Sequence, residues 1–257
     1  MTLAKHLTYV CLLLMTSLTH ARSLIPPTAI DWLLDCPLPI AKQLDPEVLE
    51  RTQCGIVTVP RYYTAAGQGS RHLFVTRVGA RDPLSREGVI FAQAGDTAQT
   101  DTGGTFAIHL ASRWSGYSSQ AYRTLINRYD VIELSPQDLN DDSEVDQAAR
   151  DMEFVRAQLG DAQLHYLGNA DATRLGNRYG ALFPDRVTRM VLVNADQDET
   201  TSPEVVQLRL KEPVASNYSG CVNQWVGSFL AYGKQPPPST RCLDRKPTDN
   251  SSQSPYQ

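Results

Sequence analysis

The segment that decides the fold is Gln163-Leu-His-Tyr-Leu-Gly-Asn-Ala-Asp-Ala-Thr-Arg-Leu-Gly-Asn-Arg-Tyr-Gly-Ala-Leu-Phe-Pro184. It predicts a strand over 163–167, a tight turn over 168–172, and a helix over 172–182. The helix should end before the proline, because a residue that precedes proline is disfavoured in the helical conformation. Small residues at both ends of the turn allow the helix to pack close to the strand. The middle residue of the turn is Ala170, whose methyl group cannot attack a carbonyl.

Two flanking segments extend this pattern. Before the turn comes Val145-Asp-Gln-Ala-Ala-Arg-Asp-Met-Glu-Phe-Val-Arg-Ala-Gln-Leu-Gly160, and after it comes Tyr179-Gly-Ala-Leu-Phe-Pro-Asp-Arg-Val-Thr-Arg-Met-Val-Leu-Val-Asn194. Together they resemble the exported tripeptidyl and prolyl aminopeptidase branch of the α/β-hydrolases. That branch has a D-x-E-x-x-R-x-x-L-G helix, a G-x-S-Y-G-T nucleophile elbow and a Y-a-x-x-F-P-x-R-V-x-x-M-V-L-D-G segment. The resemblance covers roughly Cys54 to Asp196.

The resemblance implies an α/β fold. We expect an α/β-hydrolase-like, mostly parallel sheet flanked by helices, lacking the last strands and most of the lid. The order of the remaining patterns agrees with this, because strands that alternate with helices form parallel sheets with right-handed crossovers. Strands are predicted over 55–59, 72–78, 88–93, 129–134 and 187–193, and helices over 105–114, 118–127 and 143–159.

The departures from the family pattern fall on the chemistry. Ala170 stands where the family has its nucleophilic Ser, Asp171 replaces the following Tyr, and Ala172 replaces the second Gly of the elbow that begins at Gly168. The family's oxyanion loop is Gly-rich, and the aligned stretch here is Gln93-Ala-Gly-Asp-Thr-Ala-Gln-Thr100. The loop after the fourth strand, D-x-R-G-x-G in the family, is Ser135-Pro-Gln-Asp-Leu-Asn140.

The acid and the base of a triad are also missing from their expected places. In the family the order is Ser, then acid, then His. Here no His follows residue 196, and the Asp residues after 200 are Asp244 and Asp249, both in a polar tail. We therefore predict a pseudoenzyme with no catalytic triad, a degenerate and C-terminally truncated homologue of the peptidases. The five His residues all lie upstream, at His6, His20, His72, His109 and His165.

Two other interpretations stay open. In the first, the chain is an active serine-hydrolase-like or aminopeptidase-like enzyme that uses a non-standard nucleophile, Asp171 or Ser135. In the second, it is a degenerate remnant without a selected function. Asp171 sits one position late for an elbow and is better explained as a carboxylate at a helix start. We expect His109 to be a partly exposed helix residue and His165 to be a packed core histidine.

The first 21 residues have the pattern of a secretory signal. Lys5 and His6 are followed by an apolar run over 7–18 and by Thr19-His20-Ala21, a small-x-small cleavage site. The run is too short for a membrane span, so we expect an exported protein, periplasmic or secreted. The net charge of −4 and the lack of a basic cluster disfavour nucleic acid as a partner. No cofactor or metal is predicted, because there is no C-x-x-C pair and no His at ligand spacing.

Four cysteines would remain after cleavage, and an even number in an exported chain favours disulfides. Pairing by proximity gives Cys36 with Cys54 and Cys221 with Cys242. Four cysteines allow three connectivities, and the sequence does not choose among them.

The chain divides into a signal peptide (1–21), an N-terminal arm (22–53), the hydrolase-like core (54–196), a helical lid remnant (197–234) and a disordered tail (235–257). Short helices are predicted over 29–34 and 46–52 in the arm. The segments 203–210 and 218–232 also have helical patterns. If no strand follows 187–193, that strand is an exposed sheet edge, which the C-terminal helices, a partner chain or a second copy could cover. The partners expected are thus a peptide or small acyl ligand, or another protein.

Overall fold

The computed structural model describes residues 30–38, 45–64, 68–95, 106–135, 139, 141–195, 205–208 and 220–237. The predicted signal peptide, Cys242, most of the predicted tail and most of the loop over 93–100 lie outside the described residues. None of the described helices is long and apolar enough to cross a membrane.

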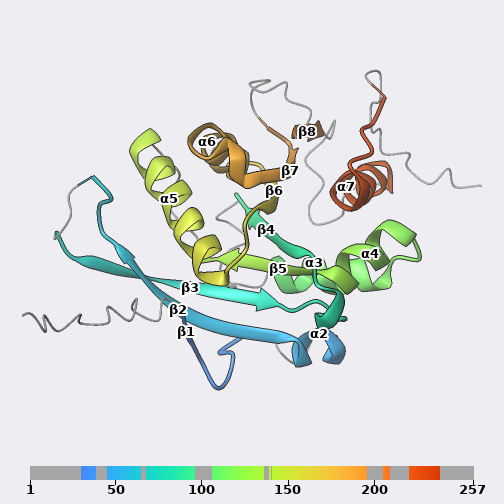
Figure 1. The fold of residues 1–257 in the computed structure, drawn as a ribbon. Helices are drawn as coiled ribbons and strands as arrows, with labels where there is room; N and C mark the ends of the chain where they lie inside the picture. The colour runs from blue at the N-terminus through green and yellow to red at the C-terminus, as the bar shows by residue number, and fades with distance from the viewer. Residues whose placement is uncertain are drawn as a thin grey trace, which may run out of the picture.

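One eight-stranded sheet forms the centre of the molecule, with the strand order β1-β2-β3-β5-β4-β6-β7-β8 (Figure 1). β1, β2 and β3 pair antiparallel with one another and β3 pairs antiparallel with β5, whereas the pairings β5–β4, β4–β6, β6–β7 and β7–β8 are parallel. The predicted parallel core is therefore confirmed, and an antiparallel part precedes it. The strands are β1 (Ile30–Trp32), β2 (Thr52–Pro60), β3 (Ser70–Val78), β4 (Gly88–Ala94), β5 (Tyr129–Leu134), β6 (Leu164–Asn169), β7 (Val187–Val193) and β8 (Val205–Leu208).

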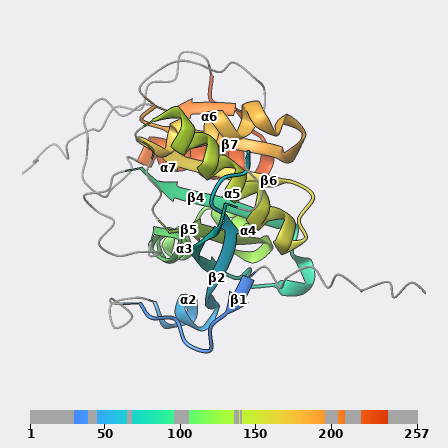
Figure 2. The same ribbon diagram turned by 90° about the vertical axis from the view of Figure 1, so that its left-hand side faces the viewer.

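Helices cover both faces of the sheet. On one face lie α5 and α6, and on the other lie α3, α4 and α7 (Figure 1 and Figure 2). Side chains of successive strand residues alternate between the two hydrophobic cores, so that Ile90 packs with one core and Phe91 with the other. This double coverage explains why the central strands are apolar throughout. The helices are α2 (Pro46–Glu50), α3 (Phe106–Gly116), α4 (Gln120–Arg128), α5 (Asp142–Leu159), α6 (Ala172–Leu182) and α7 (Gly220–Tyr232).

The helix predicted over 29–34 is wrong, because this segment forms the edge strand β1. Ile30 and Trp32 are residue types that favour strands. Gly55 on β2 makes room for them, since a Cβ atom at this glycine would lie 2.7 Å from Ile30 Cγ2. The predicted Cys36–Cys54 disulfide is confirmed, with the two Cα atoms 5.1 Å apart, and it holds β1 beside β2.

The helix predicted over 203–210 is also wrong. Its centre is β8, a strand whose first residue, Val205, pairs with Met190 of β7. Pairing with a strand edge overrides the helical spacing, and the β-branched Val205 and Val206 suit a strand. Consequently β7 is not the edge that the sequence predicted, and within the described residues that place is taken by β8. Cys221 on α7 is disulfide-bonded as well, and Cys242, its predicted partner, lies outside the described residues.

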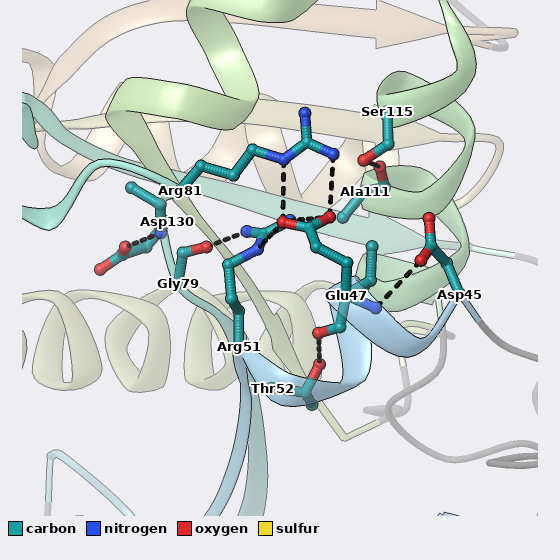
Figure 3. Close-up of polar contacts among 11 residues, drawn as sticks. Asp45, Glu47, Arg51, Thr52, Gly79, Arg81, Ala111, Ser115 and Asp130 are labelled. Atoms are coloured by element: carbon teal, nitrogen blue, oxygen red, sulfur yellow. Dashed lines mark hydrogen bonds and ion pairs between the residues drawn. The ribbon is translucent and has the colours of Figure 1, made fainter.

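A short helix and a set of ion pairs fasten the arm to the sheet (Figure 3). α2 ends at Glu50, two residues earlier than predicted, because Thr52 already belongs to β2. Glu47 of α2 is bonded to Arg81 at 2.8 Å and to Arg51 at 2.7 Å. The hydrogen bond from Arg81 and the charges of both guanidinium groups lower the pKa of Glu47 to about 2.

Candidate functional site

The turn between β6 and α6 has the geometry that places a side chain at the top of a sheet. Ala170 adopts a φ angle of 50°, a left-handed conformation that costs a residue with a side chain about 1 to 2 kcal/mol. Hydrogen bonds hold it there: its N–H donates to the Val193 carbonyl at 3.0 Å, and its carbonyl accepts from the N–H of Thr173 at 2.9 Å. A strained residue at this point is typical of a nucleophile elbow.

The small residues beneath the turn are needed for close packing against an aromatic ring. A Cβ atom at Gly168 would lie 2.7 Å from a ring carbon of Tyr166, and one at Gly176 would lie 2.5 Å from the same carbon. The buried Tyr166 hydroxyl donates to the Ala172 carbonyl at 2.7 Å. The ring of Tyr166 therefore sets how close α6 can come to β6.

Gly95, directly after β4, lies against the start of α6. Its N–H donates to the Asn169 carbonyl at 2.9 Å. A Cβ atom at Gly95 would lie only 2.4 Å from the backbone nitrogen of Asp171 and 2.2 Å from that of Ala172. In an α/β-hydrolase an oxyanion hole uses the N–H after the nucleophile together with one from this strand's loop. Gly95 thus keeps the loop close to the turn, and the rest of the loop, 96–105, lies outside the described residues.

Asn194 is a feature of the site that the sequence patterns did not single out. It follows β7, adopts a φ angle of 58°, and occupies the position where the quoted family motif ends in Gly. Asn tolerates this left-handed conformation better than most residues. Its side-chain amide donates to the Asn169 side chain at 3.3 Å, so that it joins the ends of β6 and β7 beside the turn. The signal was the Gly-to-Asn exchange at the end of the motif.

The two alternative nucleophiles differ in position. Asp171 is exposed at the start of α6, and its side chain makes no capping hydrogen bond. Ser135 lies at the end of β5, where its hydroxyl accepts the N–H of Phe74 at 3.2 Å and its N–H donates to the Phe74 carbonyl at 2.7 Å. The Ser135 hydroxyl therefore takes part in the pairing of β5 with β3.

The two described histidines of the parallel core lie on α3 and at the amino end of β6. His109 is exposed on α3, and burial of its ring and then the charge of Arg113 lower its pKa. His165 lies at the amino end of β6 and is 4% exposed, with its ring 5.0 Å from that of Tyr129. Among the described residues neither ring nitrogen of His165 has a hydrogen-bond partner. Burial, and next the charge of Arg189, lower its pKa to about 3.

Glu133 is a buried carboxyl group that sequence reasoning missed. It lies on β5, is 5% exposed, and accepts the N–H of Ala107 at the start of α3 at 2.9 Å. Burial raises its pKa to about 7, although hydrogen bonds from the Ala107 and Phe106 N–H groups act in the opposite direction. The signal was a Glu inside the apolar strand 129–134. Glu133 is thus a buried ionisable group near the carboxyl end of β5, two residues before Ser135.

The described residues contain no group of three or more His, Cys, Asp or Glu side chains arranged to hold a metal ion. At the turn itself, Ala170 combines the left-handed backbone of an elbow with a methyl side chain, which has no reactive atom.

Comparison with known proteins gives three findings. A family model described as "alpha/beta hydrolase fold" matches residues 106–235. Tripeptidyl aminopeptidase of Streptomyces lividans is 50% identical over 54 residues, which are 20% of this chain and 10% of that protein. Serine protease Hip1 of Mycobacterium bovis is 43% identical over 61 residues, 24% of this chain and 12% of that protein. The chain thus matches about a tenth of the length of these relatives.

Among solved structures, juvenile hormone epoxide hydrolase from the silkworm Bombyx mori superimposes with a TM-score of 0.40 and 14% identity, covering 56% of this chain and 36% of that one.

Proposed function

The chain belongs to the α/β-hydrolase fold family, and from this we propose that it is an exported, non-catalytic relative of the peptidases that acts by binding. The observation that carries the proposal is Ala170. The backbone keeps the strained left-handed turn at φ 50°, yet the side chain it presents has no nucleophilic atom. Removing the nucleophile of a serine hydrolase costs many orders of magnitude in rate, so binding is the activity left to such a site.

Two observations support export. The apolar run over 7–18 is followed by a small-x-small cleavage pattern. In addition, Cys36 and Cys54 form a disulfide, which persists in oxidising compartments. The proposed location is the periplasm or the extracellular medium.

The proposed ligand is a peptide or a small acyl compound held beside the turn, because relatives over short segments are peptidases. A protein partner, including a second copy of the chain, is the other candidate. Among the described strands β8, and not β7, is the edge at that end of the sheet, and a strand edge presents unpaired N–H and C=O groups that a partner strand can use.

The test is labelling of the oxidised protein with a fluorophosphonate, a probe that reacts with activated serines, read by intact mass. Ala170→Ser is labelled in parallel, after circular dichroism shows that both proteins are folded. We expect the natural protein to take up no label. If it takes up one stoichiometric label, a serine is activated and the non-catalytic proposal fails; peptide mapping would then show whether Ser135 is that serine.

The variant separates two causes of inactivity. If Ala170→Ser takes up the label, the missing hydroxyl alone explains why the natural protein is not labelled. If Ala170→Ser does not take up the label, the groups around the turn do not activate a serine at this position either. Two controls measure non-specific reaction. In one, each protein is sulfonylated or acylated before labelling, and in the other each protein is denatured before labelling.

A further inference from the structure

A cavity of about 340 Å³ lies between the β2–β3 hairpin and the first half of α5. The hairpin extends beside α5 at the left of Figure 1. None of the elbow residues lines this cavity. The lining side chains that matter here are those of Tyr62, Tyr63, Arg71, Glu144, Asp146 and Arg150.

A buried carboxylate connects the two walls of the cavity. Asp151 of α5 is fully buried, and it accepts the Tyr63 hydroxyl at 3.0 Å and forms an ion pair with Arg71. Gln147 adds a second tie between the elements by donating to the Pro60 carbonyl at 3.1 Å. Both walls are therefore fixed before any ligand enters, which lowers the entropic cost of binding.

The polar groups around the cavity carry both signs of charge. Arg71 and Arg150 are cationic, and Glu144 and Asp146 are anionic. Arg71 is already paired with Asp151, and Asp146 with Arg178. Arg150 acts on Tyr63 and Asp146 through its charge, and the ion pairs among the described residues do not include it.

We infer that this cavity binds a small zwitterion with an apolar or aromatic side group, such as a free amino acid. The carboxylate of the ligand pairs with Arg150, and its ammonium group lies toward Glu144 and Asp146. The rings of Tyr62 and Tyr63 supply an aromatic wall for the side group. A ligand with a single charge would meet like charges at one side of the cavity, because both signs line it. The inference does not depend on the proposed function of the elbow.

The test uses L-phenylalanine as the probe, with isothermal titration calorimetry on the oxidised full-length protein. N-acetyl-L-phenylalanine lacks the positive charge and L-phenylalaninamide lacks the negative charge, so they are matched controls. We expect L-phenylalanine to bind at least roughly tenfold more tightly than either control, because each control lacks one of the two charge-assisted hydrogen bonds.

Arg150→Gln should weaken L-phenylalanine binding at least roughly tenfold. Arg123→Gln removes the same charge from the exposed face of α4 and should leave binding unchanged. Tyr62→Ala tests the aromatic wall separately, and the variant should fold, because Tyr62 is 50% exposed. It should weaken the binding of L-phenylalanine while the ranking of the three probes persists.

Three results would overturn the inference: no binding of L-phenylalanine in the millimolar range by the folded protein, equal binding of the three probes, or unchanged binding by folded Arg150→Gln. Labelling of the elbow by a fluorophosphonate bears on the proposed function alone, so the two failures are distinguishable.

Discussion

The two ends of the parallel strands differ in the groups they present. At the carboxyl end, where α/β enzymes keep their chemistry, the turn at Ala170 is flanked by Gly95 and Asn194, all of them uncharged. At the amino end, charged side chains from several elements form ion pairs with one another. Asp130 of β5 is 1% exposed and is bonded to Arg86 at 2.7 Å and to Arg77 at 2.8 Å.

The network at the amino end continues outward. Arg86 also binds Asp161 at 2.6 Å, and Glu87 accepts the Tyr129 hydroxyl at 2.8 Å. The chain thus keeps the ion pairs that fix strands and helices relative to one another, whereas the elbow at the carboxyl end keeps its backbone shape but presents the methyl group of Ala170. The ion-pair network and the elbow therefore lie at opposite ends of the same sheet.

Asp130→Asn gives the largest expected effect, because it breaks the network at the amino end. Removing one partner of a buried ion pair costs about 3 to 5 kcal/mol. Here Arg77 and Arg86 would lose the carboxylate that they share, although Arg86 would keep its ion pair with Asp161. Urea unfolding should show this loss. Asp185→Asn, at an exposed site, is the control and should change the free energy of unfolding by less than about 0.5 kcal/mol. Equal stability of the two variants would contradict the structural role of the network.

Glu133→Gln tests the carboxyl end through pH. The folded-state pKa of Glu133 is raised from 4.5 to about 7, so the folded protein holds this proton more tightly than the unfolded chain does. The stabilisation is fully present below pH 4.5 and is lost as the pH rises through 7. The variant cannot ionise, so at pH 8 it should be more stable than the natural protein by up to about 3 kcal/mol.

At pH 4 the two proteins should differ little, because Glu133 is then protonated. Denaturant unfolding at both pH values measures the difference, with the exposed Glu50→Gln as a control. A gain of the same size at both pH values would mean that something other than ionisation is responsible.

Gly95→Ala should destabilise the protein by about 2 kcal/mol, because the new methyl group would meet two backbone nitrogens of α6. Gly116→Ala is the matched control, since a Cβ atom there has nothing within 4 Å. Thermal unfolding monitored by circular dichroism compares them. If both variants are equally stable, the contact between Gly95 and the turn is not as close as described.

Ala170→Gly has the smallest expected effect, and, unlike Gly95→Ala, it should stabilise the protein. Glycine relieves about 1 to 2 kcal/mol of left-handed strain but gives the unfolded chain more freedom, so a net gain of about 0.5 kcal/mol remains. Ala157→Gly on the exposed surface of α5 should instead lose about 1 kcal/mol. A loss in the first variant equal to that in the second would argue against strain at Ala170.

Much of the sheet could be predicted from the sequence, because strands such as β4 and helices such as α5 carry clear patterns of apolar residues. The strand–turn–helix at Ala170 was predictable from the small residues and the family motif. β1 and β8 were not, since each is a short segment whose conformation is decided by a neighbouring strand.

The polar groups of the candidate site were harder to predict. The partners of Glu133 and Asn194 lie on other elements, so their roles depend on tertiary contacts that no local pattern encodes. The same holds for Asp130, which pairs with arginines 44 and 53 positions away.

The left-handed turn at Ala170 also makes the chain useful to enzymologists. The backbone alone sets the direction of the Cα–Cβ bond at this position, so any side chain introduced there starts in the same direction. Serine, cysteine and aspartate could be compared in turn within one fixed frame. The protein thereby offers a starting scaffold in which the orientation of a nucleophile is already present and its reactivity can be added one atom at a time.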